Sequence, residues 1–163
     1  MAIYENPKFY KGPPLQQITA RAVDSKTWQA GQFCKRTGSG VVPCGVQSTK
    51  IHGQFAATQA TATSSSDVVV NLIPSNETQF LVYAAATTAG AGAIAGKVSI
   101  GKNLGLGVNS CICTAGISSQ TDATASLHVE DIYRNKDRFS GIMNDTSTSP
   151  GVFIVSVRSN FLA

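Results

Sequence analysis

The stretch that decides the fold is Trp28-Gln29-Ala30-Gly31-Gln32-Phe33-Cys34-Lys35-Arg36-Thr37-Gly38-Ser39-Gly40-Val41-Val42-Pro43-Cys44-Gly45-Val46. Two runs with apolar residues flank a glycine-rich centre, a pattern typical of a β-hairpin. Pro43 has no N–H to donate to a neighbouring strand, so its strand is expected at a sheet edge or at a bulge. A turn centred on Ser39 places Cys34 directly opposite Cys44.

The same β pattern continues along the chain. No window shows apolar residues sustained at the i, i+3, i+4, i+7 spacing of a helix. Further strands are expected at residues 51–55, 67–73, 79–84, 104–108, 126–130 and 151–157. About eight to ten short strands separated by turns predict an all-β fold, an antiparallel β-sandwich or β-barrel.

Three of these runs, residues 68–73, 80–83 and 152–157, are apolar on both faces of the expected strand. Such strands lie inside a sandwich or bury their second face against another subunit. Exposed apolar patches of this extent usually mark interfaces. We therefore expect a homo-oligomer in the working state. The alternative is a monomer that buries both faces between two sheets.

Residues 1–17 differ from the rest and predict an extended N-terminal arm in front of a single β domain, 18–163. Proline fixes φ and disfavours helix in the residue before it. Ordering about 17 residues costs roughly 17–34 kcal/mol, whereas burying three aromatic rings contributes about 11–19 kcal/mol. The arm should therefore be ordered only against a partner or its own sheet; a frayed terminus is the alternative. The expected partner-binding residues are Tyr4, Pro7, Lys8, Phe9, Tyr10, Lys11, Pro13 and Pro14.

Composition and charge limit the classes of partner. Apolar residues make 42% of 163, which fits one globular domain. No apolar run approaches the about 18 residues of a membrane span, and the start lacks the pattern of a secretory signal. The first 50 residues hold 7 Lys/Arg and 2 Asp/Glu, which suits an acidic partner surface or a solvated face. The basic residues are dispersed and lack an aromatic platform, so we expect no direct nucleic-acid or membrane partner.

The cysteines do not have the spacing of a metal site. Cys34 and Cys44 are separated by nine residues, and Cys111 and Cys113 by one, unlike the C-x₂₋₄-C pairs of zinc sites. Without a secretory signal all four are expected to be reduced, as small buried hydrophobes. The alternation from Leu104 onward predicts that Cys111 and Cys113 share the face of the glycines.

The histidines give no catalytic constellation. Neither His52 nor His128 accompanies a G-x-S-x-G elbow. His128, Glu130 and Asp131 are candidates for a shared metal, but a half-exposed strand explains them better. Residues 89–98 lack the first glycine and the final Ser/Thr of a phosphate loop. We therefore predict no catalytic, cofactor-binding or metal-binding residues, and a protein that is not an enzyme.

The arrangement resembles the capsid decoration (cement) proteins of tailed bacteriophages. The resembling features are the arm 1–17, Trp28-Gln29-Ala30-Gly31-Gln32-Phe33 opening a hairpin, the Thr/Ser-rich middle, and the strand 151–157 followed by Asn160-Phe161-Leu162-Ala163. Proteins of that family are β-barrels or sandwiches that sit on the shell, commonly as trimers, and clamp neighbouring capsomers. This chain is longer than the most compact members.

The resemblance implies a structural virion protein. It would be made in the host cytoplasm, bind the outside of an icosahedral phage capsid, and cement neighbouring subunits of the major capsid protein. Its partners would then be the major capsid protein and itself, as a homotrimer that matches the local threefold positions of the shell, with no cofactor. The alternative is a receptor- or carbohydrate-binding β-module of a phage fibre or lectin-like protein.

Overall fold

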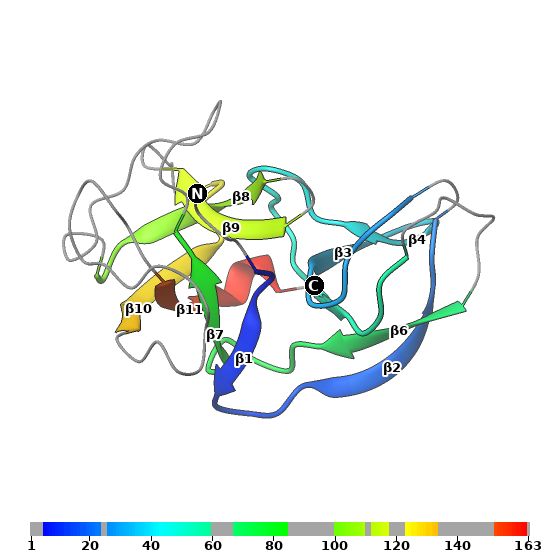
Figure 1. Cartoon of the computed structure of the whole chain (residues 1–163), viewed down its shortest axis with the longest axis horizontal. Coiled ribbons are helices and arrows are strands. Elements are labelled where there is room, and N and C mark those ends of the chain that lie inside the picture. The colour runs from blue at the N-terminus through cyan, green and yellow to red at the C-terminus, as the bar shows by residue number, and fades with distance from the viewer. Residues whose placement is uncertain are drawn as a thin grey trace.

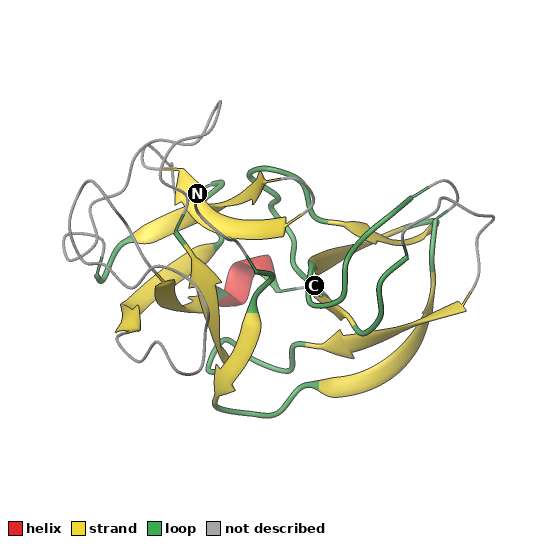
Figure 2. Cartoon of the chain, in the orientation of Figure 1, coloured by secondary structure: helices red, strands yellow, loops and turns green. Residues whose placement is uncertain are grey.

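The computed structural model describes residues 5–23, 26–59, 67–84, 100–109, 112–117, 123–133 and 152–162. Within these ranges the chain forms strands and one short 3-10 helix, so the predicted all-β class is confirmed (Figure 2). The elements are β1 (Lys8–Lys11), β2 (Gln16–Arg21), β3 (Phe33–Thr37), β4 (Gly40–Pro43), β5 (Gly53–Phe55), β6 (Asp67–Leu72), β7 (Gln79–Tyr83), β8 (Asn103–Asn109), β9 (Ile112–Ile117), β10 (Leu127–Tyr133), β11 (Val152–Val157) and η2 (Ser159–Phe161).

The strands form two antiparallel sheets. One has six strands in the order β1-β7-β11-β10-β8-β9, and the other has five in the order β2-β6-β5-β3-β4. Figure 1 shows the six-stranded sheet on the left and the five-stranded sheet on the right. In this view β1 runs from the middle down to the lower side of the molecule, and β2 continues from there to the right, so the chain passes from one sheet to the other. The N-terminal strands therefore supply an edge to each sheet.

The five-stranded sheet curls into a half-barrel. Its first and last strands meet where Ala22 pairs with Val41 in a parallel bridge, and the Val23 N–H donates to the Val41 carbonyl at 3.2 Å. Inside, the Trp28 ring stacks on Phe55 with centroids 4.2 Å apart. Trp28 lies outside the regular strands and pairs only with Gln59 through an isolated bridge. The curl thus encloses a small apolar core of its own, formed by Ala22, Trp28, Cys34, Val41, Phe55 and Val70.

The six-stranded sheet buries both of its faces. Along β7, Phe80 and Val82 join the main core, while Leu81 and Tyr83 join a separate cluster on the opposite face. Every residue of β11 is buried as well. The expectation of exposed apolar faces on these two strands is wrong, because one chain covers them without a partner. β6 differs, since Val69 is 40% exposed. The trimer stays a prediction, but the apolar faces of β7 and β11 no longer support it.

The described part of the N-terminal segment packs on its own sheets. β1 pairs with β7, and β2 pairs with β6 along its whole length, so the expected boundary at residue 17 falls inside β2. The Tyr10 ring meets Tyr133 edge-on at 5.6 Å, with Tyr10 half-buried against the outer cluster. Of the two partners left open for this segment, its own sheet is the one observed. Contact with a neighbouring subunit stays a prediction, and Tyr4 lies outside the described residues.

A buried glutamine fastens this segment to the half-barrel. The Gln54 side chain is 4% exposed, and its Nε2 donates to the carbonyls of Pro7 and Gly31, both at 2.7 Å. Beside it, Asn6 Nδ2 donates to Gln29 Oε1 at 3.1 Å, while Asn6 Oδ1 accepts from the Cys113 N–H at 3.1 Å. Two adjacent N-terminal residues therefore contact both sheets.

The hairpin is confirmed, but its register differs by one residue from the expected one. Thr37 pairs with Gly40 across a two-residue turn, so Cys34 faces Pro43 and not Cys44. A turn of this length centres between Gly38 and Ser39, whereas the expectation centred on Ser39. Since neighbouring strand residues point to opposite faces, Cys34 enters the half-barrel core and Cys44 the main core. The edge position expected for Pro43 is correct, because β4 ends the sheet.

Gly40 is the residue on which closure of the half-barrel depends. Its φ is +140°, and an added Cβ would lie 2.3 Å from the Arg21 carbonyl oxygen. We predict that Gly40→Ala lowers the free energy of unfolding by about 2–3 kcal/mol, measured by urea denaturation. Gly38→Ala is the control, because nothing lies within 4 Å of its Cβ position. Equal stability of the two variants would contradict the closure described here.

The Gln54 anchor gives a second prediction. Gln54→Leu leaves the carbonyls of buried Pro7 and half-buried Gly31 without their donor, so we expect a loss of about 3 kcal/mol in unfolding free energy. Gln59→Leu is the matched control, because Gln59 Nε2 donates to Lys26 O at an exposed position. Its cost should stay near about 0.5 kcal/mol. A Gln54 variant as stable as the Gln59 variant would show that the Gln54 hydrogen bonds contribute little to the free energy of unfolding.

Candidate functional site

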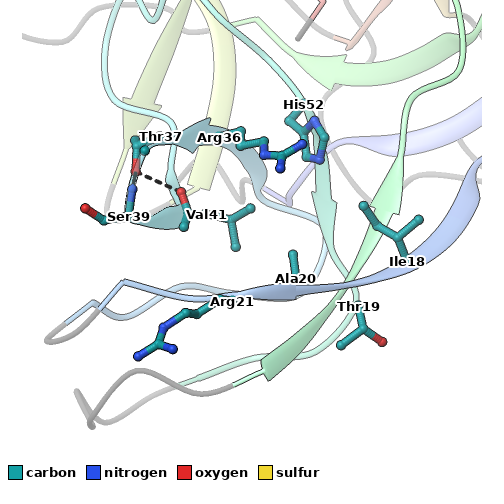
Figure 3. A pocket seen from close by; sticks show the side chains of 11 residues that line it. Ile18, Thr19, Ala20, Arg21, Arg36, Thr37, Ser39, Val41 and His52 are labelled. Atoms are coloured by element: carbon teal, nitrogen blue, oxygen red, sulfur yellow. Dashed lines mark hydrogen bonds between the residues drawn. The ribbon is translucent and has the colours of Figure 1, made fainter.

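A slot opens on the side of the half-barrel, between β2 and the β3–β4 hairpin. The two walls touch at the Ala22–Val41 bridge and separate from there toward Ile18, leaving a hollow of about 380 Å³. In Figure 3 the side chains of Ile18 and Ala20 point into this slot, while those of Thr19 and Arg21 leave on the other side of β2. The slot therefore has an apolar floor and a backbone strand as one wall.

The opposite wall of the slot is polar and basic. The Arg36 side chain extends toward the ring of His52, which is itself buried at 6% exposure (Figure 3). At the turn, Thr37 Oγ1 donates to the Gly40 carbonyl at 2.8 Å and accepts from the Ser39 N–H at 3.3 Å. No carboxylate is among the described residues that line the slot. The slot can hold an acidic group or an extended chain, but it offers no arrangement for nucleophilic catalysis.

A second, wider hollow of about 410 Å³ lies over β10, at the predicted residues His128 and Glu130. His128 Nδ1 lies 2.7 Å from Asn103 Oδ1, and Glu130 Oε1 accepts from Ser156 Oγ at 2.9 Å. In the parts of the chain that the structure covers, no three His, Cys, Asp or Glu side chains converge as metal ligands would. His128 and Glu130 hold neighbouring strands together, and the absence of a metal stays a prediction.

The described cysteines are buried thiols in the two cores. Cys34, Cys44 and Cys113 are free, and each is at most 2% exposed. Burial, more than any nearby charge, raises the pKa of Cys44 to about 12 and that of Cys34 further. The shared glycine face expected for Cys113 is wrong, because β8 ends at Asn109 and Cys113 faces the core from β9. Cys111 lies outside the described residues.

The predicted arm residues divide between core and surface. Pro7 is buried, Phe9, Tyr10 and Pro13 are half-buried, and Lys8, Lys11 and Pro14 are exposed. The Lys8 ammonium pairs with Glu5 at 2.6 Å, and Lys11 Nζ lies 5.6 Å from the Tyr10 ring centroid. The two lysines and Pro14 are thus the part of this segment that a partner can reach, while its aromatic rings contact the chain itself.

The sequence alone did not identify the slot. Its two walls are more than ten residues apart and are brought together by the curl of the sheet. The available signal was Gly40, because a glycine directly before a β-branched strand indicates a close backbone approach.

No protein-family model, curated protein or solved structure matches this chain. Among the described residues no helix has the length and apolarity needed to cross a membrane.

The burial of the thiols predicts their reactivity. Disulfide exchange requires an exposed thiolate, and burial both hides Cys34 and Cys44 and raises their pKa. In a Cys111→Ala variant at pH 8, we expect an aromatic disulfide reagent to label the remaining thiols about a hundredfold more slowly than in guanidinium. Rapid labelling of the folded protein would contradict their placement in the cores.

Proposed function

We propose that this protein is a capsid decoration protein. It binds the outside of an icosahedral phage capsid and cements neighbouring subunits of the major capsid protein. The action is adhesion: each copy bridges subunits, and symmetry repeats the same weak contacts over the shell.

The observation that carries the proposal is the position of the open sheet edges. In the described structure, β1, β2, β4 and β9 end their sheets. One isolated bridge closes on β9, between Ala84 and Ala115, and another joins the end of β2 to β4, between Ala22 and Val41. β1, β2 and β4 lie within residues 8–43, in the first 50 residues, which hold 7 of the 13 Lys/Arg. Unpaired strand edges are ready templates for another chain. The sheet edges suited to binding another chain therefore lie on strands from the basic first third of the sequence.

The remaining polar groups support binding in preference to catalysis. Among the described residues His52 is buried, and His128 and Glu130 are bonded to neighbouring strands. The alternative, a glycan-binding module, depends on exposed aromatic rings that stack on sugars. Trp28 is 3% exposed, and the large apolar side chains exposed in the described part are Val46, Val69 and Ile100. The observations therefore favour a protein partner.

Imaging of the native particle tests the proposal. Electron cryo-microscopy should show the two-sheet body outside the shell, in contact with at least two major capsid subunits. A homotrimer places these copies around local threefold axes. Density confined to a tail fibre would support the receptor-binding alternative and overturn the cementing role.

The exposed lysines of β1 give a separate prediction. Lys8→Glu with Lys11→Glu changes two exposed charges at an open edge, so the fold should persist while attraction to an acidic surface is lost. We expect occupancy on purified shells to fall at least about tenfold at low salt, measured by co-sedimentation. Lys26→Glu with Lys50→Glu is the control with the same change in charge. Equal loss in both variants would show that net charge alone matters.

A further inference from the structure

β2 pairs with β6 along one edge, whereas its other edge reaches β4 at the Ala22–Val41 bridge and leaves it from there toward Gln17. The Val23 N–H points to β4, where it meets the Val41 carbonyl at 3.2 Å. Because N–H and C=O directions alternate along a strand, the backbone groups of Arg21, Thr19 and Gln17 point the same way as those of Val23. That direction is the slot.

The hydrogen bonds of β6 show independently which residues of β2 point away from β6. The Val69 carbonyl accepts from Ala56, and the Ile73 N–H donates to His52, so the odd-numbered residues of this strand face β5. Its even-numbered residues must then face β2, opposite Ile18 and Ala20. The hydrogen bonds between β2 and β6 therefore use Ile18 and Ala20. No other strand in the described structure lies beside the outward edge at Gln17 and Thr19.

β4, which forms the opposite wall of the slot, cannot pair with this edge of β2. β4 uses Val41 for the closing bridge, and its next outward residue is Pro43, which has no N–H. An added strand therefore pairs with β2, while β4 limits how far it can enter. Edges that must stay free of partners usually carry a proline, a bulge or an inward charge. β2 has none of these and pairs without irregularity along its length.

We propose that the slot is the docking site for an extended acidic segment of the shell protein, which adds as a strand to the outward edge of β2. The inference rests on the proposed function and names the element that makes the contact. Arg36 reaches over the slot, and the described lining has no carboxylate to oppose an acidic side chain. Ile18 and Ala20 supply an apolar floor for every second residue of the incoming strand (Figure 3).

A proline at position 19 tests the edge directly. Thr19→Pro removes only the N–H that points into the slot and leaves the bonds of Ile18 and Ala20 to β6 intact. Thr19→Val is the matched control, because it keeps this N–H and the Thr19 side chain points away from the slot (Figure 3). Binding to purified shells that lack the protein should weaken at least tenfold for the proline variant and stay within twofold for the valine variant. Equal binding of both variants overturns strand addition.

The charge is tested with a second pair of variants. Arg36→Glu should weaken shell binding at least tenfold, whereas Lys102→Glu, the same change in charge at the exposed residue before β8, should leave it within twofold. If circular dichroism shows that Thr19→Pro is unfolded, this pair of variants tests the slot in its place. Equal effects of the two charge reversals would overturn the assignment of the slot as the docking site. Shells that bind the wild type and all variants alike refute the slot and leave the proposed function standing. Shells that fail to bind the wild type refute both.

Discussion

The two hydrogen bonds of the Gln54 amide are the constraint on which the rest of the structure depends. They join the carbonyls of Pro7 and Gly31 inside the protein, where each acceptor would otherwise be left without a partner. Asn6 adds its contacts to Gln29 and Cys113 at the same point. With the chain fixed there, β1 continues onto the six-stranded sheet and β2 onto the half-barrel. The N-terminal segment therefore ties the sheets together.

This arrangement links the fold to the proposed function. The segment that ties the two sheets runs along their margins, and β1 and β2 are edge strands. The same segment carries three exposed basic side chains, Lys8, Lys11 and Arg21, and Arg36 lies across the slot from β2. Stability and adhesion are thus properties of one part of the chain. The buried side chains hold it in place, and under the proposed function the partner binds to the open backbone edge with its basic neighbours.

The sequence predicted the fold class and the hairpin, because alternation and glycine-rich turns are local signals. It did not predict the register, since a pairing shifted by one residue moves Cys44 to the other face. It also placed the apolar faces of β7 and β11 at an interface, although both are covered within the chain. Which residues cover a strand depends on tertiary packing. The slot could not be predicted for the same reason, because Arg36 and Ile18 line one hollow only after the sheet curls.

Amide hydrogen exchange of the isolated protein, followed by NMR at β2, tests the central claim most directly. The claim is that the N-terminal segment is folded into the sheets and leaves one backbone edge open. We predict alternation: the amides of Ile18 and Ala20 exchange about a thousandfold more slowly than that of Thr19. Uniformly fast exchange would show a loose arm that is ordered only on a partner. Uniformly slow exchange would show that the edge of β2 is already covered.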